Sequence, residues 1–194
     1  AVSGEINQVN LLSVMNPKKI LNANEISTIL NRLSFQLIED HNSFENIVLV
    51  GIQPRGSLLA KRLTLLINNH LKSNDLKVGY LDITFFRDDF RRSEKILKAN
   101  STSLDFLIEN KTVVLVDDVL FTGRSIRAAL NAIQSFGRPL NIKLLTLIDR
   151  RFSRELPIQP DYCGTQVDSR LNEKVIVNWK ENNDEDSVYL IKNN

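Results

Sequence analysis

Two adjacent aspartates, Asp117 and Asp118, stand between an apolar run and a loop that contains Thr122, Gly123 and Ser125. Carboxylates accept hydrogen bonds from sugar hydroxyls, and Mg²⁺ prefers one or two carboxylates together with phosphate oxygens. Hydroxyls, and backbone N–H groups that approach closely at a glycine, bind phosphate. The segment therefore predicts a site for a sugar phosphate. For the acidic pair taken alone, a strand–turn–helix with a capping aspartate is the structural alternative.

A strand before this loop and a helix after it must position these groups. Residues 112–116 form an apolar run, which is typical of a parallel strand covered on both faces. Apolar residues from Ile126 to Ile133 then recur on one helical face. Ligands of open α/β sheets bind beyond the carboxyl ends of the strands, where the first turn of a helix favours an anion. The segment matches neither a Walker A loop nor a Gly-x-Gly-x-x-Gly dinucleotide turn.

A second loop with anion-binding character follows the apolar run 47–52. It consists of Gln53, Pro54, Arg55 and Gly56, and a helical pattern begins directly after it. We expect the guanidinium of Arg55 and the backbone donors around Gly56 to hold a second anionic group. A Pro-Arg turn with a purely structural role is the alternative.

Strand-like and helix-like segments alternate along the 194 residues, which predicts an α/β fold in one domain, residues 1–194. A helix is expected over 25–38 with Asn24 as its N-cap. Further strands are expected at 78–85, at 142–148, and as edge strands at 175–179 and 188–191.

Composition narrows the class of protein. Hydrophobic residues make up 42% and charged residues 25%, the balance of a soluble globular protein. No apolar run approaches the roughly 18 residues that span a bilayer, and the first residues lack the layout of a signal peptide. We therefore expect a cytoplasmic protein with no membrane partner. The net charge of +2 gives no general footprint for nucleic acid, and Cys163, His41 and His70 lack metal-ligand spacing.

Residues 113–125 resemble the 5-phosphoribosyl-1-diphosphate (PRPP) signature of the type I phosphoribosyltransferases. The resemblance implies a central, mostly parallel sheet flanked by helices, with a small C-terminal hood. It implies that Asp117 and Asp118 bind the ribose, serve catalysis and engage Mg²⁺ in part through the ligand. The residues implied to contact PRPP or a nucleotide are Pro54, Arg55, Gly56, Val119, Leu120, Phe121, Thr122, Gly123, Arg124 and Ser125.

Four further segments narrow the resemblance to the PyrR family, bifunctional regulators of pyrimidine operons with uracil phosphoribosyltransferase activity. These segments are 81–89, 137–139, 147–150 and 154–158. The implied reaction converts uracil and PRPP into UMP and pyrophosphate, with Mg²⁺ bound to PRPP. A homodimer or higher homo-oligomer is also expected.

The same resemblance assigns roles to residues outside the two loops. Arg87 should act in catalysis by facing the pyrophosphate, under a mobile loop at about 86–105. Arg150 and Val167 should lie at the base pocket, beneath a hood formed by about 151–175.

The leader of a pyrimidine-operon mRNA is the further partner that the resemblance implies. Asn31, Arg32 and Arg154 are the candidate RNA-binding residues. The chain departs from the family at Phe35, where histidine is expected, and at two positions that are usually basic, Gln159 and Thr165. RNA binding needs cations that face phosphates, so these departures count against this partner.

Two alternatives to a uracil phosphoribosyltransferase remain. One is an RNA-binding attenuator that senses UMP and has little catalytic activity. The other is a phosphoribosyltransferase for another nucleobase.

Overall fold

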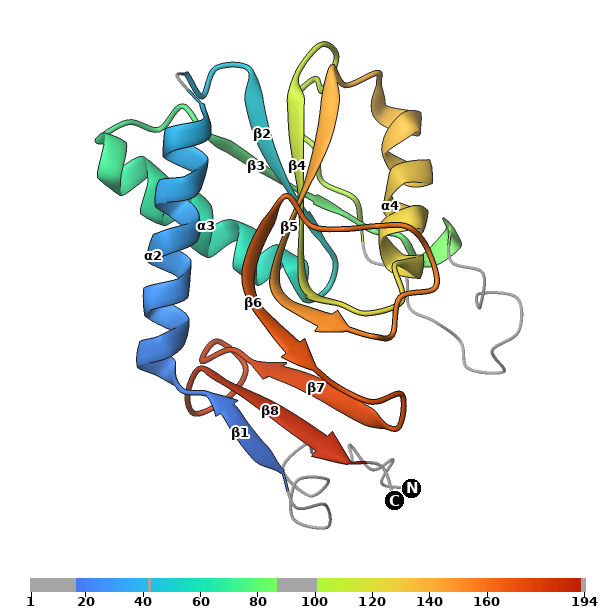
Figure 1. The fold of residues 1–194 in the computed structure, drawn as a ribbon. Helices are drawn as coiled ribbons and strands as arrows, with labels where there is room; N and C mark the ends of the chain where they lie inside the picture. Colours follow the sequence, from blue (N-terminus) through green and yellow to red (C-terminus); the bar gives the residue numbers. More distant parts are fainter. Residues whose placement is uncertain (1–16, 42, 87–100, 193–194) are drawn as a thin grey trace, which may run out of the picture.

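Five parallel strands form the central sheet of the computed structural model, which describes residues 17–41, 43–86 and 101–192 (Figure 1). Their order across the sheet is β3-β2-β4-β5-β6, and each neighbouring pair is parallel. The α/β fold predicted from the alternation of strands and helices in the sequence is therefore confirmed. The strands are β2 (Ile47–Ile52), β3 (Lys77–Leu81), β4 (Thr112–Leu120), β5 (Asn141–Arg151) and β6 (Tyr162–Asp168).

Helices cover both faces of this sheet. Figure 1 shows α2 (Ala23–Asp40) and α3 (Gly56–Leu71) on one side of β4 and α4 (Arg124–Ile133) on the other. The side chains of β4 alternate between the two cores, as the geometry of a strand requires. Val114 and Val116 pack with α2 and α3, whereas Val113 and Leu115 pack with α4. This two-sided burial explains why β4 is apolar along most of its length. Within the described ranges, no helix has the length and apolar character needed to cross a membrane.

The N-terminus of α2 differs from the expected one. Asn22, not Asn24, is the N-cap: its Oδ1 accepts from the Glu25 N–H at 3.0 Å, and Glu25 Oε2 accepts from the Asn22 N–H at 2.7 Å. This reciprocal capping box forms because Asn22 keeps the extended backbone in which the preceding strand ends, with φ −97° and ψ 175°. Asn24 already lies within the first turn.

A second, three-stranded antiparallel sheet forms the hood. Its order is β1-β8-β7, and it combines β1 (Lys18–Leu21) with β7 (Glu173–Asn178) and β8 (Ser187–Lys192). The late apolar runs thus form strands, but in this separate sheet. The expected hood boundary of 151–175 also differs, because β6 pairs with β5 in the main sheet. As an edge strand β6 retains polar, partly exposed residues, and its sequence therefore resembles a loop.

The strand expected over 78–85 ends at Leu81. Asp82 Oδ1 accepts from the backbone N–H and the hydroxyl of Thr84, at 2.9 and 2.6 Å, and this local turn starts a 3₁₀ helix, Thr84–Phe86. Residues 87–100 of the expected mobile loop lie outside the described residues. The chain returns beside β3, where Ser103 and Tyr80 exchange two backbone hydrogen bonds of 2.8 and 2.9 Å.

The capping box gives a direct test of the helix boundary. We expect Asn22→Ala to lower the free energy of unfolding by about 1 kcal/mol, because the N–H of Glu25 loses its side-chain acceptor. Asn24→Ala is the matched control and should have a smaller effect. Chemical denaturation of both variants measures the difference, and a larger loss for Asn24→Ala would contradict the assignment.

Candidate functional site

A cavity of about 480 Å³ lies at the carboxyl ends of the central strands, between the main sheet and the hood. The loop after β2, the end of β4 and the start of β7 all contribute to its wall. A second hollow of about 310 Å³, lined by residues of the loop 119–126, adjoins it and shares Asp117, Val119, Phe121 and Ser125. The larger cavity is lined by Ile52, Gln53, Pro54, Arg55, Ile83, Asp117, Asp118, Val119, Phe121, Ser125, Arg150, Leu171, Glu173, Lys174 and Val175.

Asp117 and Asp118 lie in the wall of this cavity although they are 9% and 4% exposed. The Asp118 N–H donates to Asp117 Oδ1 at 2.9 Å, which fixes the first carboxylate. Burial raises the pKa of both groups, the negative charge of Asp118 raises the pKa of Asp117 further, and the positive charge of Arg55 opposes the shift. Asp118 Oδ2 is buried and has no hydrogen-bond partner among the described residues. It is an acceptor without a donor.

The loop after β4 turns sharply into α4. Gly123 has φ +92° and is the N-cap residue of this helix, so the turn uses the left-handed region that glycine adopts readily. A Cβ at this position would lie 3.2 Å from Ile158 Cδ1, so the space is also restricted. The positive end of the helix dipole and the hydroxyls of Thr122 and Ser125 gather around the smaller hollow. This arrangement is suited to a phosphate group.

A segment after β5 holds this loop from its outer side. The N–H groups of Glu155 and Leu156 donate to the Thr122 carbonyl at 3.0 and 3.2 Å, and the Glu155 carboxylate pairs with Arg124 at 2.5 Å. The guanidinium of Arg154 donates to the Phe121 carbonyl and to the carboxylate of Asp149. The side chain of Arg154, a candidate RNA-binding residue, is therefore hydrogen-bonded to the loop after β4. Asp149 and Glu155 lie in two of the segments that carry the resemblance, 147–150 and 154–158, but the sequence assigned them no role because their contacts with the loop depend on the tertiary structure.

The loop after β2 places Arg55 opposite the acidic pair. Gly56 begins α3 directly against β4: a Cβ there would lie 2.2 Å from the Val116 carbonyl oxygen. The helix approaches β4 this closely only because the residue is glycine. Pro54 and Arg55 consequently lie in the wall of the same cavity as the carboxylates.

Arg150 and Val167 have different positions relative to the cavity. Arg150 lines it, with the guanidinium carbon 3.9 Å from the centroid of the Phe121 ring. Arg150 donates to Ser169 Oγ at 2.7 Å and to the Glu173 carbonyl at 2.8 Å, and so joins the end of β5 to the hood. Val167 packs against the core and lines a separate pocket with residues of β1 and β6, and it is not among the residues that line the cavity.

The remaining candidates lie elsewhere. Arg87 lies outside the described residues. Asn31 donates to the Ser27 carbonyl at 2.9 Å, and Arg32 donates to the carbonyls of Cys163 and Gly164; both side chains are on α2. The resemblance placed the base pocket beneath a hood at about 151–175 but named none of the wall residues Leu171, Glu173, Lys174 and Val175. Their individual positions depend on how the hood packs over the main sheet, which no motif in the sequence specifies.

The acidic pair fits a Mg²⁺ ion that shares its ligands with a bound phosphate. Asp118 Oδ2 offers an acceptor without a partner, and Asp117 lies beside it. Across the described ranges, no group of three or more histidine, cysteine, aspartate or glutamate side chains has the arrangement of a metal site. Two carboxylates with phosphate oxygens and water are the set that Mg²⁺ prefers. A Mg²⁺ ion would therefore bind here together with a phosphate-containing ligand that supplies its remaining oxygen ligands.

The buried carboxylate also predicts a pH-dependent stability. We expect Asp118→Asn to raise the thermal midpoint of unfolding, because it removes a buried charge whose pKa is raised from 3.8 by folding. The ionised carboxylate destabilises the folded protein fully above its raised folded-state pKa and not at all below its unfolded pKa, so the gain should grow as the pH rises and shrink towards about pH 4. Each kcal/mol relieved should raise the midpoint by about 2–4 °C.

Scanning calorimetry across this pH range measures the effect. Asp184→Asn, at an exposed position of the turn after β7, is the matched control. A midpoint of Asp118→Asn that falls further below the wild-type value as the pH rises would show that the ionised carboxylate stabilises the fold.

Comparison with known proteins places this site in a family. A family model described as a phosphoribosyl transferase domain matches residues 17–181. The fold is similar to that of a hypoxanthine-guanine phosphoribosyltransferase from Bacillus anthracis, with a TM-score of 0.65 and 15% identity over 89% of this chain and 96% of that chain. This likeness concerns the fold alone, and it confirms the phosphoribosyltransferase fold expected from the sequence.

Two relatives are similar over most of the chain. Bifunctional protein PyrR of Chloroflexus aurantiacus is 44% identical over 177 residues, which are 91% of this chain and 96% of that protein. Bifunctional protein PyrR of Caldicellulosiruptor bescii is 48% identical over 160 residues, 82% of this chain and 87% of that protein. The domain match and these relatives show that the chain belongs to the PyrR family of phosphoribosyltransferases.

Proposed function

We propose that the protein transfers the phosphoribosyl group of PRPP to uracil, which gives UMP and pyrophosphate. The observation that carries the proposal is the convergence of the acidic pair, the loop after β4 and Arg55 on one cavity. These groups match the hydroxyls, the 5′-phosphate and the diphosphate of PRPP. The acceptor is proposed to be uracil because the similar relatives are PyrR proteins.

Each part of PRPP has a partner of suitable chemistry in this proposal. The ribose hydroxyls donate to Asp117 and Asp118, and Asp118 Oδ2 is a buried acceptor that otherwise lacks a donor among the described residues. The 5′-phosphate lies in the smaller hollow at the start of α4, among Val119 to Ser125. The diphosphate lies beside Arg55 and the first turn of α3.

The reaction breaks the bond between ribose C1 and the diphosphate oxygen, and a uracil nitrogen forms a bond with C1 and loses its proton. Negative charge grows on the leaving diphosphate as the bond breaks. Arg55 is positioned to stabilise that charge, and Arg87 remains a proposed contributor. Mg²⁺, when bound with PRPP, would neutralise part of the same charge.

The acceptor base is proposed to bind at the hood side of the cavity. With PRPP on the main sheet, the free wall consists of Arg150, Phe121 and the residues that precede and begin β7, Leu171 to Val175. Arg150 retains its proposed role at the base, whereas Val167 has no support from the geometry.

Turnover assays test this proposal. PRPP consumption should be fastest with uracil when uracil, hypoxanthine, guanine and orotate are compared. Replacement of Asp117 and Asp118 together by Asn should lower kcat/KM by at least about 100-fold, because each charged hydrogen bond contributes about 1.5–3 kcal/mol and two are lost. Asp184→Asn is the control.

Two outcomes would contradict this assignment. Preference for a purine or for orotate would contradict the acceptor, and wild-type kinetics of the doubly substituted protein would contradict the ribose site.

We propose that RNA binding is weak in this chain. Arg32 and Arg154, the two candidate cations, are hydrogen-bonded to carbonyls of the protein itself. Phe35 is 47% exposed on α2 and brings no charge to a phosphate. Fewer phosphate contacts release fewer counterions, which lowers both affinity and its dependence on salt.

Filter binding of a pyrimidine leader hairpin, with and without UMP, measures this. We expect little sequence-dependent binding at physiological salt, and a shallow salt dependence that loses about 0.7–0.9 in slope for each missing phosphate contact. Tight binding enhanced by UMP would favour the RNA-binding attenuator, with cations other than Arg32 and Arg154.

A further inference from the structure

A group of charged side chains outside the cavity joins α3 to the turn between β7 and β8. Arg62 donates to both carboxylate oxygens of Asp186, at 2.7 and 2.8 Å, and to both of Glu181, at 2.9 and 2.5 Å. We refer to Arg62, Glu181 and Asp186 as the Arg62 clamp. Four charge-assisted hydrogen bonds from one planar guanidinium fix both distance and orientation.

The surroundings of the clamp make it more than a surface ion pair. The side chains of Arg62 and Asp186 are each 14% exposed, so solvent screens them poorly. The guanidinium also lies 4.6 Å from the ring centroid of Trp179, which is buried in the core between the hood and α3. The Lys180 N–H donates to Asp186 Oδ1 at 2.8 Å, which orients the acceptor.

The two elements that the clamp joins both reach the cavity. On α3, Arg62 follows Arg55 by seven residues, about 10 Å along the helix axis. On the hood, Glu173, Lys174 and Val175 at the start of β7 line the cavity, and Trp179 follows directly after its end. The clamp lies outside the cavity and connects two of its walls. It joins α3, which begins beside Arg55, to the hood, in which the start of β7 forms the facing wall.

We propose that Arg62 is a positioning residue that holds the start of β7 at a fixed separation from Arg55 and the acidic pair. The separation sets the width of the cavity on the hood side, where the acceptor base is proposed to bind. Because the proposed PRPP contacts lie mainly on the two loops of the main sheet, we expect PRPP binding to depend less on the position of the hood than acceptor binding does. The part of this inference that concerns the acceptor rests on the proposed function; the clamping of the hood does not.

Kinetics separate this role from a general loss of structure. Arg62→Met should raise the KM for uracil about tenfold, because it removes the clamp but leaves the loops that hold PRPP. The dissociation constant of PRPP, measured by calorimetry, should change less than about twofold. Lys61→Met is the matched control, because Lys61 is the exposed neighbour that precedes Arg62 on α3, and it should leave both values unchanged. Equal weakening of donor and acceptor, or an unchanged KM for uracil, would overturn the positioning role.

Asp186→Asn provides the second variant. Its amide oxygen still accepts from Lys180, but it cannot accept two bonds from Arg62. We expect Asp186→Asn to raise the KM for uracil, as Arg62→Met does, and to change the dissociation constant of PRPP little. The double variant should be no worse than Arg62→Met alone, since both changes remove one interaction. Additive losses would show that Arg62 acts without Asp186.

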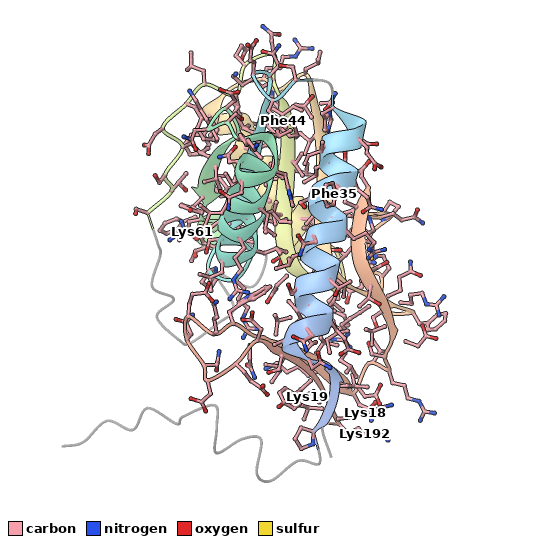
Figure 2. All side chains as sticks on the ribbon, turned by 90° about the vertical axis from the view of Figure 1, so that its left-hand side faces the viewer. Lys18, Lys19, Phe35, Phe44, Lys61 and Lys192 are labelled. Atoms are coloured by element: carbon pink, nitrogen blue, oxygen red, sulfur yellow. The ribbon has the colours of Figure 1, made fainter. Side chains whose placement is uncertain are left out.

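A distance measurement tests the clamp without any substrate. Figure 2 labels two exposed residues suited to spin labels: Lys61 on α3, and Lys192, which ends β8 in the small sheet below it. Both are replaced by cysteine for labelling, in a Cys163→Ala background. The distance distribution should be narrow with Arg62 and broader with Arg62→Met.

An equally narrow distribution in the variant would overturn the inference. A wild-type protein that does not use uracil would contradict the proposed function alone, because the distance measurement involves no substrate.

Discussion

Burying an ionised aspartate costs free energy, and β4 carries two buried aspartates near its carboxyl end. The surrounding structure is arranged around this cost. Gly56 lets the first turn of α3 touch β4, and the contact brings the positive charge of Arg55 towards the carboxylates. The compensation is incomplete, because Asp118 Oδ2 keeps no donor among the described residues. A ligand that donates hydroxyl hydrogen bonds or brings a metal ion would therefore compensate the buried charge of Asp118.

The loop after β4 is held in place by contacts with other parts of the chain. Thr122 accepts two backbone hydrogen bonds from the segment after β5, and Arg154 holds the Phe121 carbonyl. The Phe121 ring in turn stacks on Arg150, whose other contacts reach Ser169 and the start of β7. A continuous series of contacts thus links the loop to the hood. Such outer support restricts the conformations of the loop, and a loop that is already ordered loses less entropy when it binds a ligand.

The sequence predicted the centre of the molecule better than its periphery. Strand β4 and its loop were predictable, because burial on both faces produces a continuous apolar run and because the loop combines acidic residues, glycine and hydroxyls. The hood was harder to predict. Strand β1 is only four residues long, and β6 carries polar residues because it lies at an edge. The prediction of Asn24 as the N-cap was wrong for a related reason. The sequence did not indicate β1, and the end of β1 at Leu21 determines that the extended backbone stops at Asn22.

The order of strands in the hood has a consequence for synthesis. Within the hood sheet, β1 pairs with β8, and the paired residues Lys19 and Tyr189 are 170 positions apart (189 minus 19). On a ribosome β1 emerges long before its partner, and loop closure over such a span is slow. The main sheet can assemble first, from strands whose partners are already outside the exit tunnel. The cavity therefore acquires its second wall only after β8 has emerged, and a nascent chain stalled before β8 would present the loop after β4 without the complete hood sheet.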